Sequence, residues 1–362
     1  MRVLITGGGT GGHVFPAVAI AEALERRMPD VTLAFAGMAT GMEARIVAGL
    51  GRRFFPIAAA PFKGRRMLDR VRAVPTLVCA VRAASRVLTE FAPDAVVGTG
   101  GYVSAPLMGA AAWRRLPTLI HEQNSIPGLT NRLLGRVVRR VCTTYPQSNH
   151  FFPPRKVLRT GMPLRHAIVE RLRTRVQPPG PPWTIFVMGG SQGARRVNEL
   201  VIGALAGLGR SGVPCQVIHQ IGSSIDTATV ERAYRDAGIA AEVYHFIDEI
   251  EAVYARAHLV IGRAGASSVA EIALAGLPAL LIPYPHAADN HQEENARAVV
   301  ASGGALLLRE AETNSAQLLA TCLAVLQDPA RLAAMSAAMH ALATPHAAEQ
   351  IVDAVVELVQ NV

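Results

Sequence analysis

The chain repeats one local pattern, and this pattern restricts the folds that are open to it. A short apolar run leads directly into a cluster of glycines and then into a helical pattern, first at residues 3–13 and again at residues 185–194. A strand, a glycine turn and a helix in this order open the βαβ unit of a parallel sheet covered on both faces. Short apolar runs continue to alternate with helical patterns, which predicts two doubly wound α/β domains.

The expected strands are short apolar segments, each followed by turn residues. They cover residues 2–6, 31–36, 94–98, 118–121 and 140–143 in the first half, and residues 184–188, 215–219, 242–246, 258–262, 278–282 and 305–308 in the second. A turn at residues 161–163 and a proline-rich stretch at residues 178–182 indicate a boundary between the halves. We therefore place one domain at residues 1–163 and the other at residues 164–344. We expect a helix at about residues 345–362 to pack back onto the first domain.

Composition agrees with a folded protein of two domains. The chain has 362 residues, of which 50% are hydrophobic and 17% charged, and this balance excludes global disorder. Its four cysteines are far apart and form no C-x-x-C pair, which favours a reducing compartment over disulfides or structural zinc. The longest uncharged run, residues 95–113, is broken by glycines and a proline. We therefore expect a cytoplasmic protein without a transmembrane helix or a signal peptide.

Positive charge is concentrated in the first half of the chain. Residues 1–163 hold 22 Lys and Arg against 8 Asp and Glu, a net charge of +14, whereas residues 164–362 hold 14 against 19, a net charge of −5. A basic half indicates an anionic partner, such as a phosphorylated substrate, an acidic membrane or a nucleic acid. Nucleic acid is the weakest of these because the basic half lacks interleaved aromatic residues.

Residues 63–88 combine basic side chains with an apolar stripe at helical spacing. The stripe consists of Met67, Val71, Val74, Val78 and Val81, and the basic residues are Lys63, Arg65, Arg66, Arg70, Arg72, Arg82 and Arg86. Such a helix either lies on an acidic bilayer or buries its stripe in the core and exposes a solvated basic face. The residues alone leave both interpretations open, and Pro75 predicts two helical pieces here rather than one.

The first glycine cluster leaves backbone N–H groups at the positive end of a helix, where a phosphate can approach closely. An NAD site would also need an acidic residue at the end of the second strand, and residues 31–38 contain none. His13 follows the glycines at the start of the helix, where the helix dipole disfavours its protonation. It is therefore a candidate general base, the alternative being a histidine that only caps or packs.

A third segment of interest opens another helical pattern in the second half. Ser268 and Glu271 fit a capping box, and Gly276 with Pro278 fits a helix stop. Alternatively, the Glu271 carboxylate accepts hydrogen bonds from ribose hydroxyls while the helix N–H groups face a diphosphate. The polar loop at residues 283–292 follows a buried strand, a place where open α/β sheets bind ligands. Its Asp289, His286 and His291 lack the spacing of a metal site, so we expect no metal there.

The motifs occur in an ordered combination. They are residues 6–13, 100–104, 121–124, 161–165, 189–194, 246–248, 265–271 and 289–292. Together they resemble the peptidoglycan N-acetylglucosaminyltransferases of the inverting GT-B class, from about residue 2 to beyond residue 300. The resemblance implies two Rossmann-like domains across a cleft. It also implies transfer of N-acetylglucosamine from UDP-N-acetylglucosamine (UDP-GlcNAc) to lipid I, the undecaprenyl-diphosphate-MurNAc-pentapeptide, giving lipid II with a β-1,4 linkage.

The resemblance also implies roles for single residues of the first half. His13 matches a candidate base for the acceptor hydroxyl. Thr10, Gly11 and Gly12 match a loop that approaches the donor sugar and the acceptor diphosphate. Asn124 matches a residue that contacts the donor sugar.

Most of the implied donor contacts fall in the second half. Arg165 and Ser191 match contacts to the donor nucleotide, Ile247 the position whose backbone reads the uracil edge, and Gln292 a ligand of sugar hydroxyls. One segment matches the residues that hold phosphates and ribose: Ala266, Ser267, Ser268, Val269, Ala270 and Glu271. Ser268 stands where many relatives carry threonine, and Met162 where asparagine is commoner.

The implied biology is peptidoglycan synthesis, and with it cell-wall biogenesis, cell shape and cell division. The implied partners are UDP-GlcNAc, lipid I, the anionic inner leaflet of the cytoplasmic membrane and other cell-wall synthesis proteins, with peripheral attachment at the cytoplasmic face. No cofactor is expected and no metal is obligatory, because helix N-termini and Arg165 can stabilise the leaving UDP and the sequence has no D-x-D motif. Three alternatives stay open: another GT-B UDP-sugar transferase, a non-hydrolysing epimerase and a non-catalytic UDP-sugar-binding protein.

Overall fold

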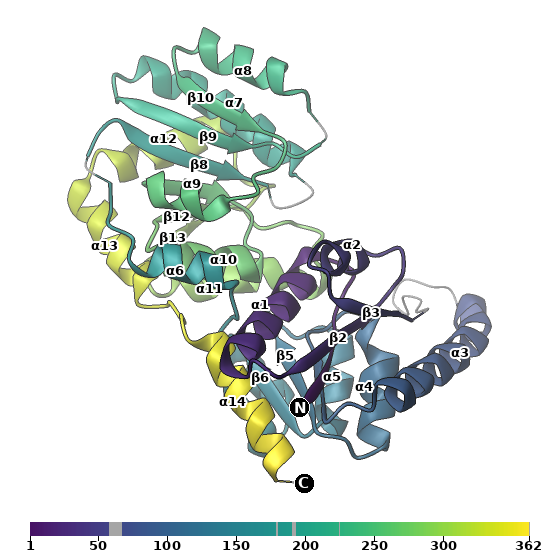
Figure 1. Cartoon of the computed structure of the whole chain (residues 1–362). Helices are drawn as coiled ribbons and strands as arrows, with labels where there is room; N and C mark the ends of the chain where they lie inside the picture. Colours follow the sequence, from purple (N-terminus) through teal and green to yellow (C-terminus); the bar gives the residue numbers. More distant parts are fainter. Residues whose placement is uncertain (58–66, 179, 190–192, 224, 362) are drawn as a thin grey trace. The chain divides into compact units, whose positions relative to one another are not determined.

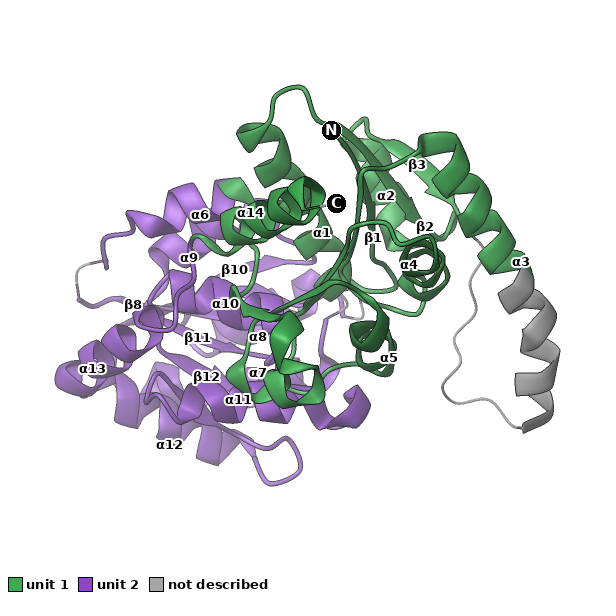
Figure 2. Cartoon of the chain, turned by 90° about the horizontal axis from the view of Figure 1, so that it is seen from below, with its two compact units in different colours: residues 1–166, 346–362 green, residues 167–345 purple. Residues whose placement is uncertain are grey.

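A computed structural model describes residues 1–57, 67–178, 180–189, 193–223 and 225–361. The chain forms two compact units (Figure 2). Unit 1 consists of residues 1–166 and 346–362, and unit 2 of residues 167–345. The second expected domain begins at residue 164, so residues 164–166, Arg165 among them, fall in unit 1.

Unit 1 is built on a parallel sheet of seven strands in the order β3-β2-β1-β4-β5-β6-β7 (Figure 1). The strands are β1 (Arg2–Thr6), β2 (Thr32–Gly37), β3 (Arg53–Pro56), β4 (Ala95–Gly98), β5 (Thr118–Glu122), β6 (Arg140–Thr143) and β7 (Val157–Arg159). The helices are α1 (Gly11–Arg27), α2 (Met42–Gly49), α3 (Met67–Phe91), α4 (Ser104–Trp113), α5 (Leu129–Val137) and α14 (Ala347–Gln360).

Helices cover both faces of this sheet, which explains the continuous apolar runs in its strands. Val3, Leu4 and Ile5 of β1 are fully buried, pointing to alternate faces. The side chains of α1 and α14 pack on one face, and those of α3, α4 and α5 pack on the other. The C-terminal helix α14 lies beside α1 (Figures 1 and 2), and Arg26 and Glu349 join the two helices by an ion pair of 2.9 Å.

Unit 2 repeats the winding with six parallel strands in the order β10-β9-β8-β11-β12-β13. The strands are β8 (Trp183–Met188), β9 (Cys215–Gln220), β10 (Ala240–Tyr244), β11 (Leu259–Gly262), β12 (Ala279–Leu281) and β13 (Ala305–Leu307). The helices are α6 (His166–Arg173), α7 (Arg195–Arg210), α8 (Thr227–Asp236), α9 (Ile250–Arg256), α10 (Ala266–Leu274), α11 (His291–Val300), α12 (Ser315–Leu326) and α13 (Pro329–His340). The predicted fold class, two Rossmann-like α/β domains, is confirmed.

The structure corrects the sequence predictions in two places. It adds β3 and β7, the two edge strands of unit 1. Edge strands pack against only one neighbour, and the residues of these two are largely exposed or half-buried, so they lack a continuous apolar run. Helix α3 also continues through Pro75, because an internal proline removes one backbone hydrogen bond without always ending a helix.

The strand order reverses at one point in each sheet, between β1 and β4 in unit 1 and between β8 and β11 in unit 2. The loops that follow these strands diverge, and the crevice between them is where open α/β sheets bind ligands. Both glycine clusters found in the sequence follow the first strand of such a pair. The topology therefore predicts ligand-binding residues at the carboxyl-terminal edges of the two sheets.

Within the described ranges, no single helix is long and apolar enough to cross a membrane. The pair α12 and α13 meets the length and composition criteria only together, and it is bent by 92°.

Candidate active site

The two loops at the switch point of unit 1 interlock through their backbones. The Gly8 N–H donates to the Gly100 carbonyl at 3.4 Å. A Cβ on Gly101, whose φ is +82°, would overlap the Gly8 carbonyl, and a Cβ on Gly7 would overlap the Thr99 hydroxyl. The packing of one loop on the other therefore requires glycine at positions 7 and 101.

His13 lies in the first turn of α1, half-buried beside the second loop. Its Nδ1 lies 3.0 Å from the Thr99 carbonyl oxygen, and the Thr99 hydroxyl donates to the His13 carbonyl at 2.7 Å. A carbonyl oxygen only accepts, so Nδ1 carries the proton of the neutral ring and Nε2 carries the lone pair. This tautomer suits a general base that works through Nε2.

The segment after β5 meets the same carbonyl. Gln123 Nε2 donates to the Thr99 oxygen at 2.5 Å. The Glu122 carboxylate accepts from the Asn124 backbone at 2.9 Å, from Asn124 Nδ2 at 3.4 Å and from Asn131 Nδ2 at 2.9 Å. Asn124, a predicted donor-sugar contact, is thus oriented by a buried carboxylate. No local sequence pattern predicts this role for Glu122 or Asn131, although Glu122 lies within the motif at residues 121–124.

Burial perturbs both ionisable groups at the end of β5. It raises the pKa of Glu122 to about 7, against the opposite effect of hydrogen bonds from Asn124 and Asn131. Burial also lowers the pKa of His121 to about 4, although the ring has a hydrogen bond with the Gly161 carbonyl. His121 is therefore neutral at pH 7.

Several buried polar atoms at this edge of the sheet have no hydrogen-bond partner among the residues that the structure describes. They are Thr6 Oγ1, His121 Nδ1, Gln123 Oε1 and Asn131 Oδ1. Buried polar atoms in native proteins usually bind a protein group, an ordered water or a ligand. These atoms form a buried polar cluster directly beneath this edge of the sheet.

In unit 2, α10 begins at Ala266 with Gly265 as its N-cap, and no side chain caps its first N–H groups. The capping box predicted from Ser268 and Glu271 is therefore wrong, because the helix starts before Ser268. Glu271 instead accepts a hydrogen bond of 3.0 Å from the hydroxyl of Tyr254, which is fully buried. The predicted stop is confirmed, since Gly276 has φ +60° directly after the C-cap.

The N-terminus of α10 presents small side chains around its uncapped N–H groups. Ser267 and Ser268 are half-buried, Ala266 and Val269 are buried, and Ala270 is half-buried on the next turn. The Ser267 hydroxyl is buried with no hydrogen-bond partner in the described parts of the chain. An uncapped helix N-terminus with small residues suits an oxyanion.

Gln292 lies in the second position of α11, after the polar loop that follows β12. Its Oε1 accepts from the Tyr284 backbone N–H at 2.9 Å, which leaves the Nε2 donor to meet a ligand. Asp289 and Asn290 before it both have left-handed φ values, +53° and +55°. Non-glycine residues adopt this conformation at a cost that surrounding contacts must offset.

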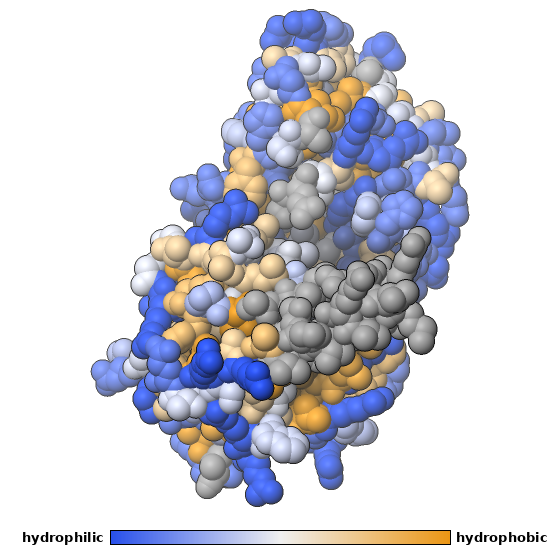
Figure 3. Space-filling view, turned by 90° about the vertical axis from the view of Figure 1, so that its right-hand side faces the viewer, coloured by the Kyte–Doolittle hydropathy of each residue, from blue (hydrophilic) through white to orange (hydrophobic). Residues whose placement is uncertain are grey.

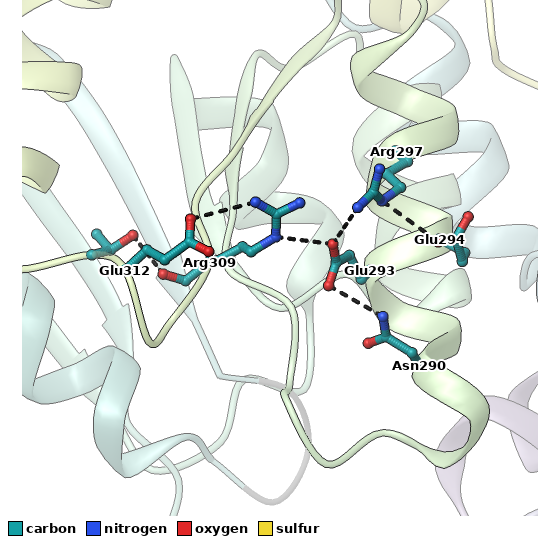
Figure 4. Close-up of polar contacts among 7 residues, drawn as sticks. Asn290, Glu293, Glu294, Arg297, Arg309 and Glu312 are labelled. Atoms are coloured by element: carbon teal, nitrogen blue, oxygen red, sulfur yellow. Dashed lines mark hydrogen bonds and ion pairs between the residues drawn. The ribbon is translucent and has the colours of Figure 1, made fainter.

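Figure 4 shows the contacts that hold this turn. The Glu293 carboxylate accepts from Asn290 Nδ2 at 3.2 Å, from Arg297 at 2.7 Å and from Arg309 Nε at 3.0 Å. The hydrogen bond from Asn290, together with those from the two arginines, lowers the pKa of Glu293 to about 2. The network ties the strained turn to α11 and to the segment after β13.

The remaining predicted residues are more scattered. Arg165 is half-buried in unit 1, with its guanidinium 5.1 Å from the centre of the Phe15 ring. Ile247 is half-buried in the loop after β10. Ser191 lies outside the described residues.

Unit 1 thus brings Thr10, Gly11, Gly12, His13 and Asn124 to one edge of its sheet, and their roles stay predictions. Within the described residues, no group of three or more His, Cys, Asp or Glu side chains could hold a metal ion.

Two family matches define the class of enzyme to which this protein belongs. Residues 3–143 match the glycosyltransferase family 28 N-terminal domain, and residues 184–351 match the glycosyltransferase family 28 C-terminal domain. The chain is therefore a family 28 glycosyltransferase.

Relatives that match this chain over nearly the whole of both lengths define its family within that class. The chain is 41% identical over 352 residues to a UDP-N-acetylglucosamine--N-acetylmuramyl-(pentapeptide) pyrophosphoryl-undecaprenol N-acetylglucosamine transferase of Desulfotalea psychrophila, covering 97% of this chain and 95% of the relative. It is 41% identical over 364 residues to the protein of the same name from Anaeromyxobacter dehalogenans, covering 100% and 94%. The crystal structure of Acinetobacter baumannii MurG matches with a TM-score of 0.79 at 30% identity, covering 98% of this chain and 99% of that one. The chain belongs to the MurG family, which confirms the resemblance found in its motifs.

A UDP-GlcNAc 2-epimerase from Neisseria meningitidis, solved with UDP-GlcNAc, matches with a TM-score of 0.70 at 14% identity, covering 99% of this chain and 100% of that one. At that identity the likeness shows a shared fold alone.

The raised pKa of Glu122 predicts a pH-dependent stability. The folded state holds the Glu122 proton more tightly than the unfolded chain, whose carboxyl pKa is about 4.5. The stabilising contribution is therefore complete below pH 4.5 and is lost as the pH rises through 7, by at most about 1.4 kcal/mol per pH unit. Urea unfolding of wild type and Glu122→Gln across pH 4–8 measures it, since the variant lacks this titration. The wild-type advantage should shrink as the pH rises.

Glu349→Gln removes an exposed carboxylate of the same unit and serves as the control, with no such slope expected. A wild-type advantage over Glu122→Gln that stays flat or grows with pH would show that folding does not raise the pKa of Glu122.

Proposed function

We propose that the protein transfers N-acetylglucosamine from UDP-GlcNAc to lipid I, forming lipid II in peptidoglycan synthesis. The observation that carries the proposal is the match, over nearly the full length of both chains, to transferases whose names state this donor and this acceptor. The site geometry supports it, because each sheet presents a glycine-bounded helix N-terminus at its carboxyl-terminal edge.

Unit 1 supplies the acceptor side of the reaction. The acceptor sugar hydroxyl attacks the anomeric carbon of the donor, and His13 Nε2 takes its proton as the new bond forms. One displacement inverts the α-linked donor to a β-1,4 product. The acceptor diphosphate binds near Thr10, Gly11 and Gly12, where the α1 N-terminus attracts negative charge, and Asn124 contacts the donor sugar.

Unit 2 holds the donor nucleotide. Glu271, fixed by Tyr254, accepts from the ribose hydroxyls, and Gln292 donates through Nε2 to the sugar. The Ile247 backbone reads the uracil edge. The N-terminus of α10, with Ser191, stabilises the charge that grows on the departing UDP, so that no metal is obligatory. Arg165, which belongs to unit 1, is proposed as a further contact of the donor nucleotide.

The direct test offers lipid I and a mixture of UDP sugars to the protein and identifies the products by mass spectrometry, with and without excess EDTA. We expect one N-acetylglucosamine to be added to lipid I, and UDP to be released only when lipid I is present. EDTA should leave the rate largely unchanged. Use of another acceptor would favour a different UDP-sugar transferase, and epimerised UDP-GlcNAc would favour the epimerase. Binding without turnover would favour a non-catalytic protein.

The proposed base makes a separate prediction. His13→Ala should lower kcat at least about a hundredfold, because the acceptor hydroxyl loses its proton acceptor, while UDP-GlcNAc binding persists. Steady-state rates and calorimetric donor titration measure the two effects. His150→Ala, an exposed histidine of the same unit, is the control and should retain wild-type turnover. Turnover of His13→Ala near the wild-type rate would remove His13 from the mechanism.

The acceptor is lipid-linked, so the proposal includes peripheral binding to the anionic inner leaflet, where other cell-wall synthesis proteins are further partners. An exposed apolar stripe on α5 supports it: Leu129, Leu133 and Val137 are 51%, 54% and 57% exposed and four residues apart. Arg136 on the same helix is exposed, and an apolar stripe beside arginines suits an acidic lipid surface. In Figure 3, hydrophobic patches gather on the lower, unit 1 part of the face shown. The stripe predicted at residues 63–88 lies mostly outside the described side chains, and Val81 is 42% exposed.

Co-sedimentation with vesicles tests membrane binding. Wild type should sediment with anionic vesicles, and binding should fall on neutral vesicles or at high salt, because arginine attraction is screened. Replacing Leu129, Leu133 and Val137 by serine should weaken binding at least several-fold. Leu50→Ser, which changes an exposed leucine elsewhere in unit 1, should not. Absence of binding to either vesicle would contradict the membrane proposal.

A further inference from the structure

The carboxylate of Glu43 is buried under the first glycine loop, in the first turn of α2. Glu43 is only 2% exposed and lies outside every motif that carried the resemblance. Its Oε1 accepts from the Met38 backbone N–H at 3.0 Å, and its Oε2 accepts from the Gly9 backbone N–H at 3.3 Å. The helix dipole favours an acidic side chain in this first turn. A buried carboxylate is therefore stabilised by N–H donors from two separate segments.

Glycines from three segments make the space for this side chain. A Cβ on Gly37, at the end of β2, would lie 2.7 Å from Glu43 Cγ, and a Cβ on Gly8 or Gly41 would overlap the carboxyl group. Gly8 belongs to the loop before α1, and Gly41 is the N-cap of α2. Any larger side chain at these positions would displace the carboxylate.

The opposite side of the same loop is held by the second glycine loop. The Gly8 N–H donates to the Gly100 carbonyl, and the Gly9 α-carbon faces the Tyr102 ring, which a Cβ would approach to 3.8 Å. The Tyr102 hydroxyl in turn lies 3.2 Å from Met38 Sδ, next to the N–H that Glu43 binds. The Gly8–Gly9 backbone is thus fixed between loop 99–102 and the Glu43 carboxylate.

This arrangement decides which N–H groups are left for a ligand. The Gly9 N–H already donates to Glu43, and the N–H groups of His13 and Val14 donate to the Thr10 carbonyl. An oxyanion at this loop is therefore directed to the N–H groups of Thr10, the N-cap of α1, and of Gly11 and Gly12 in its first turn. His13 follows directly, so its placement depends on the same backbone.

We infer that Glu43 is a positioning residue of the acceptor side: its buried carboxylate fixes the Gly8–Gly9 backbone and thereby places the start of α1 and His13. The inference rests on the proposed function, because it gives this backbone the task of holding the acceptor diphosphate and the base. Glu43 itself touches no reacting atom in this account.

Glu43→Gln tests the role of the second acceptor oxygen at nearly constant volume. The amide replaces one oxygen by an NH2 group, which cannot accept from Gly9 or Met38. We expect kcat with lipid I to fall about ten- to hundredfold, as small misplacements of a catalytic group do. The KM and Kd for UDP-GlcNAc should change less than about threefold, since unit 2 is untouched. Glu90→Gln, an exposed ion-pair partner of Arg53, is the control and should keep the wild-type kcat.

A second variant keeps the test informative if Glu43→Gln folds poorly. Gly37→Ala places a methyl group against Glu43 and should lower kcat in the same way. In the Glu43→Ala background the methyl finds space, so Gly37→Ala should cost little more. Such non-additivity would locate both effects at the same contact. Donor titration counts folded protein in each preparation.

Three outcomes are distinguishable. A Glu43→Gln enzyme within twofold of the wild-type kcat would overturn the inference. A loss of donor binding in parallel with kcat would reduce Glu43 to a purely structural residue and would also overturn it. Wild type that fails to use lipid I would instead overturn the proposed function.

Discussion

The carbonyl oxygen of Thr99, directly after β4, joins the parts of unit 1 on which the site depends. It accepts from His13 on α1 and from Gln123 after β5. The Thr99 backbone N–H donates to the Thr6 carbonyl at the end of β1, and its hydroxyl donates to α1. One residue thus ties together the two strands of the switch point, the first helix and the next strand. A side chain on Gly7 would overlap the Thr99 hydroxyl. The contacts of Thr99 therefore require glycine at position 7.

Unit 2 uses the same topology for a different chemical task. In both units the helix after a central strand begins without a side-chain cap, at Thr10 for α1 and at Gly265 for α10. Of these two helices, α1 carries a histidine in its first turn, whereas α10 carries small residues and, one turn on, a carboxylate fixed by Tyr254. Duplicated winding therefore yields one edge suited to a base and another suited to a phosphorylated nucleotide.

The sequence was sufficient for the fold class and for the central strands, because strands covered on both faces carry continuous apolar runs. Edge strands β3 and β7 lack that signal. The wrong capping box shows a limit of local patterns, since Ser268 and Glu271 fit the motif while the helix starts at Ala266. No sequence pattern predicts the role of Glu43, because its partners are the backbone N–H groups of Gly9 and Met38. The role of Asn131 depends on contacts to His121 and Glu122 that only the fold creates. Gly37 and Gly41, on either side of Met38 and close to Glu43, are the one sequence feature that could have indicated its role. Only the folded loop shows that they surround a carboxylate.

The proposed role of His13 as the base depends most directly on the tautomer of its ring. If the Thr99 carbonyl fixes the ring, Nδ1 is protonated in the neutral form and Nε2 is the acceptor that serves as base. ¹⁵N NMR of protein labelled at histidine distinguishes the two nitrogens by their chemical shifts, with His13→Ala to assign the signal. We expect the neutral ring of His13 to carry its proton on Nδ1 in the protein without substrate. A neutral His13 protonated on Nε2 would contradict it.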